Sequence, residues 1–122
     1  MKMLHFEETE DTPEVRYDEQ AETLLIRGRS LPEDAYTFYQ PVLEWAKGLR
    51  ESGKGTFTIE LFLEYFNSSS GRYLLELFLA LGDAGIPEKK IVWLVEQDDE
   101  LMIEKGEEFS LLIQVPFHIQ AV

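Results

Sequence analysis

The middle of the chain reads Thr56-Phe57-Thr58-Ile59-Glu60-Leu61-Phe62-Leu63-Glu64-Tyr65-Phe66-Asn67-Ser68-Ser69-Ser70-Gly71-Arg72-Tyr73. Its first part, through Phe66, is rich in β-branched and aromatic residues, and their alternation predicts a strand with one face largely buried. Beyond the serines, apolar residues recur at helical spacing up to Gly82, at Tyr73, Leu74, Leu77, Phe78 and Leu81. The stretch therefore predicts a strand that passes directly into a helix, with the helix capped by residues within Asn67–Ser70.

The junction between this strand and this helix carries three hydroxyls and an amide. A helix start presents unpaired backbone N–H groups and about half a positive elementary charge, and both attract anions such as a phosphoryl group. Arg72, one turn into the helix, adds a positive charge. The alternative is that Asn67 or a serine is simply an N-cap, because amides and hydroxyls are the usual cap chemistry. Both interpretations are compatible with these residues.

The segments before the junction predict a β-hairpin and a helix. Strand patterns occupy Glu14–Asp18 and Thr23–Gly28, and Leu4-His5-Phe6 is a candidate for a further strand. Ser30-Leu31-Pro32-Glu33 has the form of a capping box, with Ser30 at the cap. We expect the helix that follows to extend to Leu49, with Pro41 kinking or restarting it, and to end at Ser52-Gly53-Lys54-Gly55.

The segments after the junction predict an interior strand, a third helix and an edge strand. Lys89–Glu96 is strongly apolar, Asp98–Gln114 is mostly helical in pattern, and Pro116–Val122 alternates like a short edge strand. This order of elements indicates a single small α/β domain over residues 1–122. We expect a mixed sheet with an N-terminal hairpin, covered mainly on one face by about three helices.

Composition limits the functional classes. The 122 residues carry 24 acidic and 11 basic side chains, a net charge of −13, which disfavours binding to nucleic acid or anionic membranes. A hydrophobic content of 44% excludes a disordered chain. The sequence has no cysteine, no signal-peptide pattern near Met1 and no apolar run long enough to cross a membrane, so we expect a cytoplasmic protein.

The residues that a catalytic or metal site requires are not grouped in the sequence. His5 and His118 lie far apart and outside any metal-ligand spacing, so structural roles are expected for both. The acidic residues from Glu96 to Glu108 lack the spacing of a calcium loop and are expected on a solvated helix face. Gly53-Lys54-Gly55 does not match a phosphate-binding loop. We therefore expect a protein that is not an enzyme and needs no cofactor or metal.

An ordered set of short blocks along nearly the whole chain resembles the SiaC family of regulatory phosphoproteins. The blocks are Thr12-Pro13, Gly28-x-Ser30-x-Pro32-Glu33-Asp34, Glu44-Trp45, Tyr65-Phe66-Asn67-Ser68-Ser69-Ser70, Val92-Trp93, Gly106-Glu107-Glu108-Phe109 and Pro116-Phe117. Each block is weakly specific alone, and their common order carries the resemblance.

This resemblance implies a fold like that of anti-sigma-factor antagonists (STAS-like), in which a hydroxyl residue at a helix start accepts phosphate. It also implies a kinase of the anti-sigma-factor type, a metal-dependent serine/threonine phosphatase, and a target such as a diguanylate cyclase. The family links this partner switching to cyclic-di-GMP signalling and biofilm formation.

The family's acceptor position, after the asparagine and before two serines, falls on Ser68. Serine stands here where the family member on which the comparison rests has threonine, and Gly71 replaces a larger apolar residue, which is expected to loosen the first turn. These departures make Ser69 a second candidate acceptor. Asn67, Ser69, Ser70 and Arg72 are the expected flanking residues that contact partners. A protein-interaction adaptor without phosphorylation remains the alternative, followed by a small enzyme.

Overall fold

The computed structural model describes residues 1–122, which form one six-stranded sheet and three α-helices. In chain order the elements are β1 (His5–Phe6), β2 (Glu14–Asp18), β3 (Thr23–Ser30), α1 (Ala35–Lys47), a 3₁₀ turn η1 (Gly48–Glu51), β4 (Thr56–Phe66), α2 (Ser68–Gly82), β5 (Glu88–Val95), α3 (Glu100–Leu112) and β6 (Phe117–Ala121).

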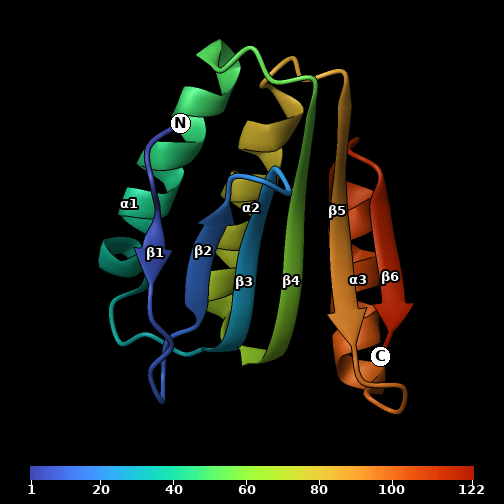
Figure 1. Ribbon diagram of the computed structural model, residues 1–122. Coiled ribbons are helices and arrows are strands. Elements are labelled where there is room, and N and C mark those ends of the chain that lie inside the picture. Colours follow the sequence, from blue (N-terminus) through green and yellow to red (C-terminus); the bar gives the residue numbers. More distant parts are fainter.

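The strands lie in the sheet in the same order as in the chain (Figure 1). β1, β2 and β3 pair antiparallel, whereas β3, β4, β5 and β6 are mutually parallel. Parallel neighbours require a crossover, and α1, α2 and α3 supply the three crossovers. Crossovers of one hand along a sheet that grows in one direction leave all three helices on the same face. Every helix therefore begins at the same end of the sheet, the end at which the parallel strands finish.

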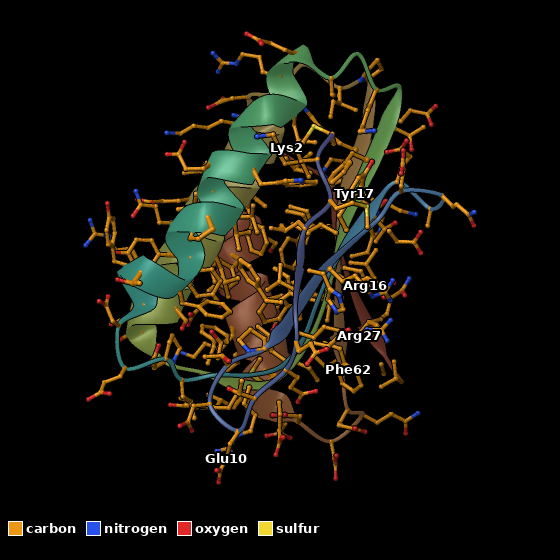
Figure 2. All side chains as sticks on the ribbon, turned by 60° about the vertical axis from the view of Figure 1, so that its left-hand side comes forward. Lys2, Glu10, Arg16, Tyr17, Arg27 and Phe62 are labelled. Carbon is orange, nitrogen blue, oxygen red and sulfur yellow. The ribbon has the colours of Figure 1, made fainter.

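The core lies between the sheet and this helical layer. Alternate residues of β4 point into it and are buried, namely Phe57, Ile59, Leu61 and Leu63. The residues between them belong to the opposite face, which no helix covers. Arg27 pairs with Phe62 in register on that face, and Figure 2 shows both on the side of the sheet away from α1. The sheet is thus apolar toward the helices and mixed in character toward solvent. Cover by helices on one face is as predicted.

Most of the predicted elements are confirmed. The hairpin forms from β2 and β3, β5 is an interior strand, and β6 is an edge strand. The N-terminal candidate strand is reduced to the two residues of β1. None of the helices is long and apolar enough to span a membrane.

One prediction about the first helix is wrong. Ser30 does not cap α1, because β3 continues through Ser30 and the cap is Asp34, whose side chain accepts a hydrogen bond from the backbone N–H of Thr37. Of the two outcomes expected at Pro41, a restart of the helix is excluded, since α1 runs through it as one element, and a kink stays a prediction. The chain loses one backbone donor at Pro41, and packing of Tyr39, Val42, Trp45 and Ala46 into the core offsets that loss.

Candidate functional site at the start of α2

The start of α2 is fixed by Asn67, which links it to the end of β3. Asn67 has an extended backbone, and its side-chain oxygen accepts a hydrogen bond of 2.9 Å from the N–H of Ser70. Its backbone carbonyl accepts from the N–H of Gly71 at 3.0 Å, and its own N–H donates to the carbonyl of Ser30 at 3.1 Å. The predicted cap is therefore confirmed, and its position is set by a neighbouring strand.

Ser70 is the inward-facing serine of the three. It is completely buried; its hydroxyl accepts a hydrogen bond of 2.8 Å from the hydroxyl of Ser30 and donates one of 3.0 Å to the Ser30 carbonyl. The Ser30 hydroxyl in turn contacts the hydroxyl of Tyr39, a fully buried residue of α1. Burial raises the pKa of Tyr39 to about 12, so its hydroxyl stays protonated in this network.

This network joins β3, α1 and the first turn of α2, and sequence reasoning missed it. Ser30 and Ser70 are 40 positions apart, and neither shows a pattern that marks the contact. Because Ser70 has no exposed surface, it cannot contact a partner while the domain is folded. The structure thus removes Ser70 from the predicted partner-binding residues and gives it a positioning role.

Ser68 and Ser69 are the outward-facing serines, at the first and second positions of α2. Both are exposed, so both hydroxyls are open to a modifying enzyme. Backbone N–H groups in the first turn of a helix have no acceptor within the helix. Asn67 accepts from Ser70 and Gly71, which leaves the N–H groups of Ser68 and Ser69 available to an anion.

The cap of α2 is electrically neutral, unlike the caps of the other two helices. Asp34 caps α1, and Asp99 followed by Glu100 begins α3. No acidic residue lies in the cap or first turn of α2. In a chain of net charge −13, α2 is therefore the helix whose positive end is not compensated by a carboxylate of its own.

A cavity of about 230 Å³ opens beside Ser68, between α2 and α3. Apolar side chains form most of its wall, and Lys105 and Glu108 stand on the α3 side; the apolar residues are Phe66, Leu75, Phe109 and Leu112. The ammonium of Lys105 lies 6.0 Å from the centroid of the Phe66 ring. Leu112 is 61% exposed at this cavity, so a large apolar side chain has no cover here within the chain.

Gly71 also borders the cavity, and its lack of a side chain makes room for Phe66. A Cβ at this position would lie 3.1 Å from Cε2 of the Phe66 ring, closer than ordinary van der Waals contact. A larger residue here therefore requires the ring to shift. The expected loosening of the first turn stays a prediction.

Arg72 is exposed and turns toward the aromatic residues of the helical layer. Its guanidinium carbon lies 5.7 Å from the centroid of the Tyr73 ring. No hydrogen bond or ion pair joins it to Ser68 or Ser69 in this structure. Its positive charge thus lies near the helix start and forms no ion pair.

The remaining candidate residues have individual structural environments. Nε2 of His5 lies 3.7 Å from Oε2 of Glu14 on the neighbouring strand. His118 lies on β6, at the opposite edge of the sheet. Asp99 serves as the cap of α3. No group of three or more His, Cys, Asp or Glu side chains has a metal-binding arrangement.

Comparison with known proteins agrees with this geometry. The family model described as "SiaC family regulatory phosphoprotein" matches residues 6–122. The chain belongs to the SiaC family. A similar sequence is the uncharacterised protein PA14_02130 of Pseudomonas aeruginosa (strain UCBPP-PA14), 31% identical over 99% of this chain and 98% of that protein.

Solved structures of SiaC from Pseudomonas aeruginosa have the same fold as this chain. The apo-SiaC crystal structure matches with a TM-score of 0.87 and 30% identity, over 99% of this chain and all of that one. The crystal structure of the diguanylate cyclase SiaD in complex with its activator SiaC contains a match with a TM-score of 0.90 and 30% identity, over 98% of this chain and 99% of that one. The recognised family and the predicted α/β fold are therefore both confirmed.

Proposed function

We propose that this member of the SiaC family is a non-catalytic switch, comprising residues 1–122, in which reversible phosphorylation of Ser68 controls binding to a target protein. One observation carries the proposal: Ser68 presents an exposed hydroxyl at an uncompensated helix start, on the rim of an apolar cavity. Ser69 is exposed as well but does not line the cavity, so it is the second candidate acceptor.

The phosphate acts on binding more than on folding. Phosphoserine adds about −1.5 to −2 charges, and its interaction with an exposed helix start stabilises by about 0.3–1 kcal/mol. This is small beside a domain stability of ~5–15 kcal/mol. A partner that fills the cavity beside Ser68, however, has to desolvate the phosphate or place it against its own acidic groups. A loss of ~3 kcal/mol at that contact weakens binding by about a hundredfold.

The partners follow from family membership and from the solved SiaD–SiaC complex, in which SiaC is the activator of a diguanylate cyclase. We propose a diguanylate cyclase as the target of the unphosphorylated chain, in the cytoplasm. A kinase of the anti-sigma-factor type transfers the γ-phosphoryl group of ATP to the Ser68 hydroxyl and releases ADP. A metal-dependent phosphatase removes the phosphate by hydrolysis. Asn67, Ser69 and Arg72 are the proposed flanking contacts.

Mass spectrometry after incubation with ATP and the kinase tests the modification. We expect one phosphate on Ser68 of the wild type, its removal by the phosphatase, and no phosphate on Ser68→Ala. Ser69→Ala is the matched control and is expected to be phosphorylated normally. A phosphate retained in Ser68→Ala and lost in Ser69→Ala would move the switch to Ser69.

Titration of the cyclase with the phosphorylated and unphosphorylated chain tests the switch itself. We expect about a hundredfold weaker binding of the phosphorylated form, and wild-type affinity for Ser68→Ala in the presence of kinase and ATP. Equal affinity of the two forms would contradict control of binding by the phosphate. The phosphorylated protein is preferable to Ser68→Asp here, since one carboxylate carries less charge than phosphate.

A constitutive adaptor is the second candidate, because the α2 cap forms without the serine hydroxyls. The side chain of Asn67 caps α2, and the hydroxyls of Ser68 and Ser69 take no part in that cap. An adaptor would bind the same target with no phosphate detected under any of these conditions. An enzyme would instead turn over a small molecule alone, and a ligand would raise its melting temperature.

A further inference from the structure

The two edges of the sheet differ in how they are protected from other strands. β1 forms one edge with only two residues, and the acidic residues Glu7, Glu8, Glu10 and Asp11 follow it directly. β6 forms the other edge with five residues and contains neither a charged residue nor a proline. Short strands, charges and prolines are the usual means by which an edge strand avoids pairing with another chain. The β1 edge has such protection and the β6 edge does not.

The absence of charge extends beyond β6. No Asp, Glu, Lys or Arg occurs from Phe109 to Val122, although 29% of the whole chain is charged. This segment comprises the last turn of α3 and the edge strand, which lie together in the fold. Leu111 and Val122 within it are 86% and 53% exposed. The segment is thus an uncharged, partly apolar surface on a strongly acidic protein.

The hydrogen bonds of β6 show which backbone groups are free. The carbonyl of Pro116 accepts from the N–H of Ile91, and the N–H of Val122 donates to the carbonyl of Val95, both at 2.9 Å. Even-numbered positions therefore bond to β5. The N–H and C=O groups of Phe117, Ile119 and Ala121 point away from the sheet, where no strand lies.

We infer that β6 pairs antiparallel with β6 of a second copy of this chain, which joins the two sheets across a two-fold axis. The distribution of charge favours a second copy of the chain as the partner of this edge. A different partner that recognises a protein of net charge −13 is expected to be basic and to meet carboxylates, and this edge offers none. Two copies carry the same net charge and repel each other, and contact through the uncharged edge keeps their Asp and Glu side chains out of the interface.

The sequence of β6 is compatible with its own reverse. Phe117-His118-Ile119-Gln120-Ala121 set antiparallel against itself places no like-charged side chains opposite one another. A two-fold axis perpendicular to the sheet also keeps both helical layers on one side of the joined sheet. Such an interface is small, and we expect a dissociation constant on the order of micromolar.

The molar mass of the full chain in solution, measured by light scattering from about 1 μM to about 1 mM, tests this inference. We expect the wild type to approach twice 14.2 kDa with increasing concentration. Ala121→Pro removes one outward N–H and is expected to weaken dimerisation by at least about tenfold. Ala121→Ser is the matched control, because it keeps that N–H and should dimerise like the wild type. Gln120→Lys places an ammonium opposite His118 of the second copy and diagonal to that copy's own ammonium, and it is expected to give a monomer with a folded circular dichroism spectrum.

A wild type that stays monomeric over this range would overturn the inference, and so would dimers of Gln120→Lys and Ala121→Pro as stable as those of the wild type. If Ala121→Pro does not fold, Gln120→Lys decides. A cross-link locates the contact independently, because the chain has no cysteine. Gln120→Cys is expected to be joined by a short bismaleimide, whereas the exposed Gln40→Cys on α1 is not.

Discussion

The starts of α2 and α3 make an instructive pair. Each follows directly or closely on a parallel strand, and each is capped by a side-chain oxygen that accepts from the N–H three residues on, at 2.9 Å from Asn67 and 3.1 Å from Asp99. The geometry is nearly the same, but the charge is not. Asp99 and Glu100 place carboxylates at the positive end of α3, whereas α2 begins with an amide and serines. The neutral start is the one that can accept a phosphate without opposing charge.

The inner and outer sides of the α2 start also differ from each other. Ser70 is locked to Ser30 and, through it, to Tyr39, while Ser68 two residues earlier is exposed. A phosphate on Ser68 therefore stays in water at the surface. The same helix turn combines a rigid buried side with a modifiable outer side, and this combination suits a switch that changes a surface without changing the fold.

The contrast between the two sides is tested most strongly by the same substitution on each. Ser70→Asp places a carboxylate in a buried network that contains no cation, so we expect the free energy of unfolding to fall by about 3 kcal/mol or more. Ser68→Asp places it at an exposed helix start and is expected to change stability by less than about 1 kcal/mol. Urea unfolding of both variants measures the difference. Equal losses would mean that the inner and outer positions are not distinct.

Removal of the Tyr39 hydroxyl has a smaller effect on the buried side. Tyr39→Phe keeps the ring between Phe38 and Tyr73 and removes only the contact with Ser30. We expect a loss of about 1 kcal/mol in the free energy of unfolding. Tyr36→Phe is the matched control, because Tyr36 is 55% exposed and its hydroxyl has no protein partner. An equal effect of the two substitutions would mean that the buried network does not contribute to the free energy of unfolding.

Local patterns in the sequence were sufficient to predict β4, α2, the hairpin and the edge strand, since alternation and helical spacing are properties of short segments. A cap within Asn67–Ser70 followed from the same local chemistry, and the structure assigns it to Asn67. Ser68 was singled out by the family resemblance, not by a local pattern. The assignment of Ser30 to a capping box failed because a serine and a glutamate three residues apart also occur where a buried strand ends. Only the parallel pairing of β3 with β4, which places Ser30 beside Phe66, explains its position.

The cavity beside Ser68 is not predictable from such patterns. Leu75 and Leu112 belong to different helices, and they line one cavity only because both crossovers return on the same face of the sheet. Phosphorylation of Ser68 itself, implied by family resemblance, stays a prediction. The geometry adds the reason why a phosphate there would affect an apolar contact.

Exchange of the caps tests the role of charge at the helix starts. Asn67→Asp gives α2 the carboxylate that α3 already has, and we expect it to stabilise the unphosphorylated chain by about 0.3–1 kcal/mol. Asp99→Asn is the reciprocal change and is expected to destabilise by a similar amount at low salt. Thermal unfolding at low and high ionic strength measures both. If the effects persist undiminished at high salt, they do not arise from the helix dipole.

The smallest effect is expected in acid, where the Asp34 cap of α1 titrates and the neutral cap of α2 does not. Hydrogen bonds from the side chain and the backbone N–H of Thr37 hold the pKa of Asp34 below its ordinary value of 3.8. Because the folded pKa is the lower one, the contribution of this cap is fully present above about pH 3.8 and is lost as the pH falls through the folded pKa. Asn67 has no proton to gain in this range.

Amide hydrogen exchange, corrected for its intrinsic pH dependence, should therefore show that the N–H of Thr37 loses protection in acid while that of Ser70 keeps it. Parallel loss at both positions would indicate global acid unfolding, and its absence at Thr37 would show that the carboxylate of Asp34 caps α1 equally well when protonated.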